Sequence, residues 1–178
     1  AMVGKGSLDA YASYEQLSGG VAKLFGAGPA QSVQEYADSV GKGVEEVQAT
    51  YDDLKRAEGM VAENAQRAFQ TAGMSANQYM ETATSFSASL IGSLGGDTVK
   101  AAELTDVAMR SMSDNVNTFG SNFEDVQNAY QGFAKQNYTM LDNLKLGYGG
   151  TKGEMERLIE DANEYAASIG EAGDMTID

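Results

Sequence analysis

The longest regular apolar pattern in the sequence runs from Val33 to Leu54 and reads VQEYADSVGKGVEEVQATYDDL. Its apolar positions alternate in steps of four and three over three heptads, which is the spacing of a helical seam packed against another helix. The pattern predicts one long helix, which further small apolar residues extend to Ala72. The candidate partner-facing seam consists of Val33, Ala37, Val40, Val44, Val47, Tyr51 and Leu54.

Two partners for this seam stay open. A long amphipathic helix can bury it within its own domain, and a coiled coil can bury it between chains in a homo-oligomer. Gly41, Gly43 and Gly59 weaken the helical pattern, because a glycine inside a helix costs about 1 kcal/mol relative to alanine. Light scattering on the chain distinguishes the two arrangements.

Helices are also predicted for the rest of the sequence. Ala, Gln, Glu, Met and Leu dominate between glycine clusters, and the β-branched residues do not alternate as they do in strands. The sequence therefore predicts an all-α fold, a multi-helix bundle of about six helices with glycine-rich connections.

Several residues predict where helices begin and end. Ser75 with Gln78 and Thr151 with Glu154 have the spacing of capping boxes. Asp97 is placed to cap the next helix, and Pro29, the single proline, is expected in the first turn of the long helix. Helical spacing predicts that a large set of apolar residues faces inward, among them Tyr11, Leu104, Phe119, Met140, Tyr165 and Ile169.

The domain organisation follows from these helices and from the two ends of the chain. Residues 8–170 are expected to form a single helical domain, or a helical arm at 8–72 joined to a bundle at 75–170. Residues 1–7 are expected to be a cloning scar or disordered, and residues 171–178 a frayed acidic tail.

The composition argues against several classes of function. Twelve basic against 26 acidic residues give a net charge of −14, which disfavours nucleic acid and anionic membranes. No apolar run approaches the roughly 20 residues that span a bilayer. The chain has no cysteine and no histidine, which removes thiol nucleophiles and the commonest metal ligand.

A search for catalytic patterns finds no candidate. Acidic neighbours such as Glu45–Glu46 and Glu160–Asp161 point in different directions on a helix, whereas acid–base catalysis needs carboxyl groups that converge. Ser39 and Lys42 match a Ser-x-x-Lys spacing, but the companion Lys-Thr-Gly element is missing. We predict that the chain is not an enzyme and that it has no catalytic, cofactor-binding or metal-binding residues.

Three stretches carry a resemblance to a known family. YEQLSGGVAKLFG at Tyr14–Gly26 and AFQTAGMSANQYMETATSFSASLIGSLGGDTVKAAELTDVAMRSMSDN at Ala68–Asn115 are the first two. The most specific is FGSNFEDVQNAYQGFAKQNYTMLDNLKLGYGGTKGEMERLI at Phe119–Ile159. Together they resemble the tape measure proteins of long-tailed phages and prophages of Gram-positive bacteria. The segment Pro29–Ala57 shares only the general character of that family.

The resemblance implies a virion structural protein. Tape measure proteins are long, largely helical chains that lie in the lumen of the tail tube, set tail length and template tube assembly. The resemblance implies partners among the tail tube protein, the tail assembly chaperones and the tail-tip proteins, with assembly in the host cytoplasm. It supplies no catalytic residues.

Two other functions are kept as alternatives. A secreted helical-hairpin interaction protein shares the acidity and the small size, but such proteins carry a Trp-x-Gly turn and this chain has no tryptophan. A cell-wall-degrading module needs a carboxylate pair in a pocket or a metal site.

Overall fold

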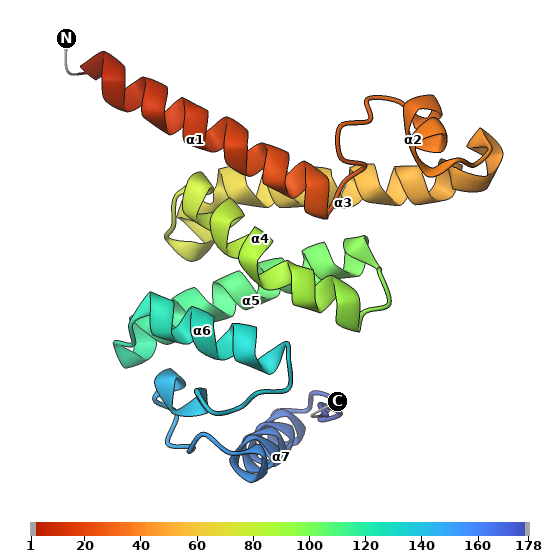
Figure 1. The fold of residues 1–178 in the computed structure, drawn as a ribbon. Helices are drawn as coiled ribbons and strands as arrows, with labels where there is room; N and C mark the ends of the chain where they lie inside the picture. Colours follow the sequence, from red (N-terminus) through yellow and green to blue (C-terminus); the bar gives the residue numbers. More distant parts are fainter. Residues whose placement is uncertain (1–2, 177–178) are drawn as a thin grey trace. The chain divides into compact units, whose positions relative to one another are not determined.

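The chain is helical throughout the part that the structure describes. A computed structural model describes residues 3–176, with side chains from residue 9 onward (Figure 1). Within those residues it has no strand, so the predicted all-α class is confirmed. The elements are α1 (Val3–Leu24), α2 (Val33–Val40), α3 (Val44–Ala72), α4 (Ala76–Ser93), α5 (Thr98–Phe119), α6 (Phe123–Phe133), the 3₁₀-helix η1 (Leu141–Leu144) and α7 (Lys152–Ser168).

The chain divides into two compact units. Unit 1 is Ala1–Ser111 and unit 2 is Met112–Asp178. The division falls inside α5; the sequence predicted a single domain over residues 8–170 or, as the alternative, an arm at 8–72 joined to a bundle at 75–170.

Unit 1 is held together by α1, α3 and α4, which pack against one another (Figure 1). The buried face of α3 consists mostly of alanines, and Ala57, Ala65 and Ala68 are each at most 2% exposed. Small side chains at a helix contact let the backbones approach closely, and larger groups on the facing helices fill the remaining space. Phe25 after α1 and Met80 of α4 are among these larger groups, at 0% and 1% exposed.

Polar contacts join α4 to the first half of α5 inside unit 1. The hydroxyls of Ser87 and Thr105, both fully buried, are 2.6 Å apart. The hydroxyl of Tyr79 donates to Asp106 Oδ1 at 3.0 Å, and Asp106 Oδ2 accepts from Arg110 at 2.9 Å. Burial, followed by the charge of Asp106, raises the pKa of Tyr79, so this tyrosine stays a protonated donor.

The helix ends of unit 1 follow several of the predicted caps. The Gln78 N–H donates to Ser75 Oγ at 3.2 Å, and the Lys100 N–H donates to Asp97 Oδ1 at 2.9 Å. Gly73 closes α3 with φ +61°, a left-handed conformation that favours glycine. These side chains satisfy backbone N–H groups that a helix leaves without an internal partner.

The prediction of one continuous helix from Val33 to Ala72 is wrong. The chain forms two helices, because Gly41 adopts a left-handed conformation and ends α2 before α3 begins at Val44. The position predicted for Pro29 is also wrong, because it lies in the loop before α2, whose N-cap is Ser32.

Unit 2 orders a long irregular segment by hydrogen bonds from side chains to backbone carbonyls. Asn115 of α5 donates to the Leu144 carbonyl at 2.9 Å from a buried position, and Lys145 donates to the Gly120 carbonyl at 2.8 Å. Leu141 and Leu144 of η1 are buried as predicted, at 0% and 5% exposed. The rings of Tyr130, Phe133 and Tyr138 form a chain of contacts with centroids 5.7 and 6.2 Å apart.

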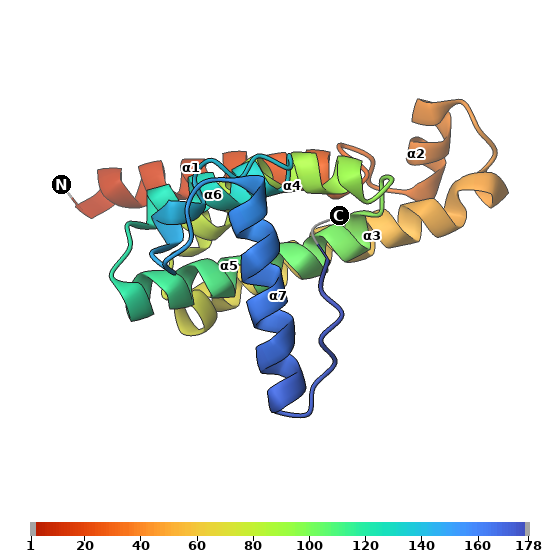
Figure 2. The same cartoon turned by 90° about the horizontal axis from the view of Figure 1, so that it is seen from below.

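In unit 2, α7 has the returning C-terminal segment beside it (Figure 2). Asn163 donates to the Met175 carbonyl at 2.9 Å and accepts from the Met175 N–H at 3.0 Å. A Cβ on Gly173 would lie 2.5 Å from the Asn163 carbonyl oxygen, so this approach requires glycine. The predicted acidic tail has no helix over residues 171–176, and these contacts fasten it to α7. Residues 177 and 178 lie outside the described part.

For six apolar residues, the prediction that the side chain faces inward and is buried is wrong. Each follows the helical spacing of its neighbours, but its side chain is exposed to solvent. Their exposed fractions are Tyr11 62%, Leu104 39%, Phe119 46%, Met140 45%, Tyr165 67% and Ile169 54%.

The prediction for the N-terminal residues 1–7 falls partly outside the residues that the structure describes. Residues 3–7, which we expected to be a cloning scar or disordered, belong to α1, and residues 1 and 2 are not described. Among the described residues, no helix combines the length and the apolar character needed to cross a bilayer.

Replacing Tyr79 with phenylalanine tests the polar contact between α4 and α5. The change keeps the ring in the core but leaves Asp106 without one donor, and a hydrogen bond to a charged group contributes about 1.5–3 kcal/mol. We expect Tyr79→Phe to lower the free energy of unfolding by about 2 kcal/mol, measured by urea denaturation. Tyr165→Phe, at an exposed position, is the control and is expected to change the stability by under about 0.5 kcal/mol. Equal stability of Tyr79→Phe and the parent would contradict this account.

Candidate functional site

The predicted seam lies in a helical hairpin made of α2 and the first half of α3. The start of α2 is fixed by Ser32, whose Oγ accepts from the Glu35 N–H at 3.2 Å. The Glu35 carboxylate reaches back and accepts from the Gln31 N–H at 2.7 Å. Ser32 and Glu35 have the capping-box spacing, which is a sequence signal for this helix start that the apolar pattern does not contain.

The turn of the hairpin depends on Gly41. Its φ of +68° closes α2, and the following Lys42 N–H donates to the Ala37 carbonyl at 3.0 Å. This is the hydrogen-bond pattern with which a left-handed residue ends a helix. Gly43 then serves as the N-cap of α3 without a side-chain bond.

The seam residues differ in burial: two are buried, four are half-buried and one is exposed. Ala37 of α2 and Val47 of α3 are buried in the hairpin, at 0% and 4% exposed. Val40 is 44% exposed and does not join them. Val33, Val44, Tyr51 and Leu54 are half-buried.

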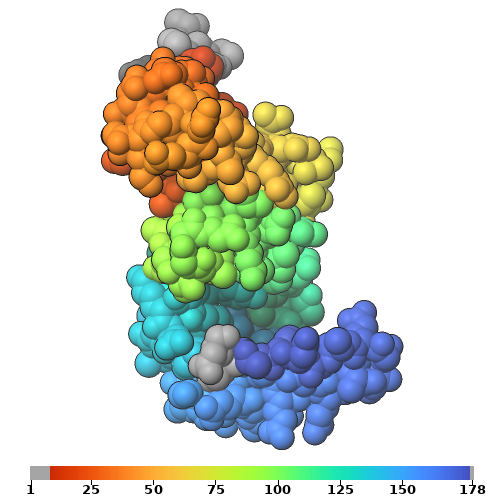
Figure 3. Space-filling view, turned by 90° about the vertical axis from the view of Figure 1, so that its right-hand side faces the viewer, coloured from red at the N-terminus to blue at the C-terminus, as the bar shows by residue number. Residues whose placement is uncertain are grey.

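An aromatic contact adds to the hairpin. The rings of Tyr36 and Tyr51 lie with centroids 5.8 Å apart at an interplanar angle of 42°. The orange atoms of α2 and of the start of α3 form a continuous surface in Figure 3. Ala37 and Val47 of the seam are therefore buried within one chain, and Val33, Val44, Tyr51 and Leu54 remain partly accessible.

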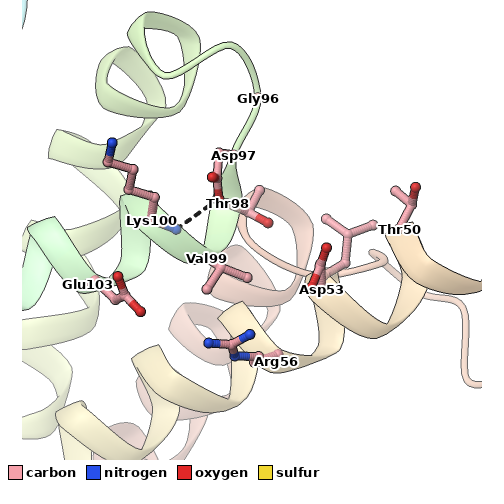
Figure 4. A pocket seen from close by; sticks show the side chains of 10 residues that line it. Thr50, Asp53, Arg56, Gly96, Asp97, Thr98, Val99, Lys100 and Glu103 are labelled. Atoms are coloured by element: carbon pink, nitrogen blue, oxygen red, sulfur yellow. Dashed lines mark hydrogen bonds between the residues drawn. The ribbon is translucent and has the colours of Figure 1, made fainter.

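A depression of about 520 Å³ lies beside the end of the seam in unit 1 (Figure 4). On one side are α3 residues, with Asp53 and Arg56 directed towards the first turn of α5. On the other side Val99 and Glu103 face α3, and the Lys100 ammonium group points away from both α3 side chains. Its lining is Thr50, Asp53, Leu54, Arg56, Gly96, Asp97, Thr98, Val99, Lys100 and Glu103.

The depression has the character of a polar contact surface. Its ionisable side chains include both signs, namely Asp53, Asp97 and Glu103 against Arg56 and Lys100, and Asp97 is already engaged in capping α5. Among residues 3–176 no group of three or more acidic side chains is arranged to hold a metal ion. The arrangement can pair with charged and hydrogen-bonding groups of another protein surface.

A second polar cluster lies where the glycine-rich elbow of unit 2 meets α7. The Tyr148 hydroxyl donates to Asp161 Oδ2 at 2.5 Å, and the Arg157 guanidinium lies 4.4 Å from the centre of the Tyr148 ring. Arg157 also donates to Glu154 Oε2 at 2.6 Å, and that same oxygen accepts from the Gly149 N–H at 3.2 Å. Through these bonds the side chains hold the glycine-rich elbow against α7, so the cluster serves as a structural fastening of the elbow to this helix.

The capping box predicted at Thr151 is half confirmed by this cluster. Thr151 Oγ1 accepts from the Glu154 N–H at 3.2 Å, as the pattern predicts. The Glu154 carboxylate, however, bonds to Gly149 and Arg157 rather than to the Thr151 N–H. The bond from Arg157, followed by that from Gly149, lowers the pKa of Glu154.

Comparison with known proteins gives no relative. The chain matches no protein-family model, no curated protein and no solved structure. The hairpin surface and the adjoining depression are therefore chosen as the candidate functional site from their geometry alone.

Two glycine substitutions with opposite expected signs test the hairpin turn. Gly41→Ala is expected to destabilise the chain by about 1 kcal/mol, because alanine is strained at positive φ although the space around Gly41 is open. Gly59→Ala, in the open middle of α3, is expected to stabilise it by up to about 1 kcal/mol. Urea denaturation measures both. A stabilising Gly41→Ala would mean that α2 and α3 are one continuous helix.

The titration of Glu154 tests the fastening at the elbow. Because the folded pKa of Glu154 is lowered, its bonds stabilise the elbow above the ordinary value of 4.5 and are lost as the pH falls through the folded pKa. An NMR pH titration of the Glu154 carboxyl carbon is expected to have its midpoint below 4.5. Arg157→Gln is expected to move that midpoint upward. A midpoint at or above 4.5 in the parent chain would show that the bonds are not formed.

Proposed function

We propose that this chain is a folded module of a phage or prophage tail tape measure protein. The observation that carries the proposal is the resemblance of Tyr14–Gly26, Ala68–Asn115 and, most specifically, Phe119–Ile159 to that family. The helical content of residues 3–176 is compatible with it, since members of the family are largely helical. The module acts as a structural protein of the virion and carries out no catalysis.

Within the parent protein, we assign the module to assembly rather than to the measurement of length. A ruler made of extended helix gains about 1.5 Å for every residue. In unit 1, α1, α3 and α4 lie against one another, and the chain turns back between α2 and α3. Residues arranged in this way add little to length, but they present surfaces for other proteins.

The hairpin surface is the region that we assign to contact with assembly partners. The half-buried seam residue Leu54 lines the depression, which also has charged side chains of both signs. Such a combination of apolar and polar groups is typical of protein–protein interfaces that form during assembly. The partners implied by the resemblance are the tail tube protein, the tail assembly chaperones and the tail-tip proteins.

The charge of the module suits a location in the tail lumen. A net charge of −14 repels DNA, which is expected to pass through the same lumen during infection. The module is accordingly expected not to retain duplex DNA in a gel shift at moderate salt.

Two deletions in the parent phage test the proposal. One removes residues 8–170 in frame, and the other removes an equal number of residues from the extended helical region of the parent protein. The second deletion is expected to shorten tails by about 1.5 Å per residue, as electron microscopy measures. The first is expected to reduce the number of complete tails sharply.

The results of the two deletions distinguish a role in tail assembly from a role in measuring tail length. Complete tails that are shortened in proportion after the first deletion would assign this module to measurement. Complete tails of full length would show that the module has no part in assembly. Unchanged length after the second deletion would refute the ruler role of the parent.

A further inference from the structure

α7 and its C-cap residue Ile169 carry an apolar stripe that is half-buried at Leu158 and Ala162 and exposed at Tyr165 and Ile169. Leu158, Ala162, Tyr165 and Ile169, which we term the α7 stripe, follow each other in steps of four, three and four, so they share one side of the helix. Tyr165 is 67% exposed and Ile169 is 54% exposed. Within unit 2, Figure 2 shows the returning tail beside the second half of α7.

The surroundings of the stripe are acidic on both sides. Asp161 and Glu164 lie on one side, and the tail carries Glu171 and Asp174 along the other, where Asn163 holds it. Residues 158–178 contain six acidic residues and no lysine or arginine. No basic residue occupies the last turn of α7 either, so the negative end of the helix dipole is not compensated next to Ile169.

We propose that the α7 stripe binds a basic amphipathic helical segment of another protein. The occupant presents aliphatic side chains at steps of three and four to Tyr165 and Ile169, and lysine or arginine to the acidic flanks. A spacing of four, three and four is the one that two packed helices share. Charge complementarity of this kind steers association and fixes the orientation of the partner.

A second copy of the chain does not suit the same surface. Pairing two α7 helices along their stripes would place the acidic flanks of one against those of the other, without a cation from residues 158–178 of either chain. Like charges that face each other across an interface oppose association. This inference does not depend on the proposed function, because it uses only the stripe and its flanks.

Fluorescence anisotropy on the full chain tests the proposal with designed peptides. The probe is a labelled two-heptad peptide with leucine at the contact positions and lysine beside them, and the comparison peptide has glutamate in place of lysine. The lysine peptide is expected to bind at least about tenfold tighter than the glutamate peptide. The stripe variant, which combines Tyr165→Ser with Ile169→Ser, is expected to bind the lysine peptide about tenfold or more weakly than the parent.

Matched variants separate the stripe from general attraction to an acidic protein. Tyr11→Ser with Leu104→Ser changes two other exposed apolar residues, in unit 1, and is expected to leave the affinity within about twofold. Circular dichroism checks that both double variants keep the helical content of the parent.

Four results would overturn the proposal. They are no binding of the lysine peptide at micromolar concentration, equal binding by the parent and the stripe variant, equal binding of a lysine peptide without leucine, and self-association of the parent that the stripe variant abolishes. The last result would assign the stripe to a second copy.

Discussion

The close approach of α3 to α1 and α4 is the contact on which unit 1 depends. It is possible because the buried residues of α3 from Ala57 onward are alanines and Val61, which is 0% exposed. A larger side chain at Ala57 or Ala68 would force the helices apart, since well-packed interiors do not accept added volume without strain. The buried polar contacts of α4 with α5 rely on the same approach, because hydrogen bonds such as Ser87 to Thr105 at 2.6 Å tolerate little displacement.

The sequence predicted the type of structure well because each helix carries its own signals. Glycine clusters, capping residues such as Ser75 and Asp97, and apolar spacing all act within a few residues of one another. The buried phase of α3 was also predictable, since its alanines recur at helical intervals. Local chemistry therefore accounts for the all-α class and for several helix ends.

What the sequence did not predict depended on competition between signals or on distant parts of the chain. The 4-3 spacing of Val33 to Leu54 suggested one helix, but the left-handed preference of Gly41 prevailed and folded the seam onto itself. Ser87 is fully buried beside Thr105, a hydrogen-bond partner 18 residues later that no local pattern in the sequence reveals. Exposure of Tyr165 and Ile169 depends on which helices happen to cover α7, and helical spacing alone carries no such information. The hairpin surface was predictable as a set of residues but not as a shape.

The three fastenings of α7 have a consequence for how the protein comes apart. Tyr148 to Asp161, Gly149 to Glu154, and Asn163 to Met175 are all exposed polar ties, and little buried apolar area supports them. Segments of this kind open locally with a smaller free energy than the core of a domain. We therefore expect the C-terminal helix to open in a separate step of unfolding, while the alanine-packed helices of unit 1 keep their native amide protection.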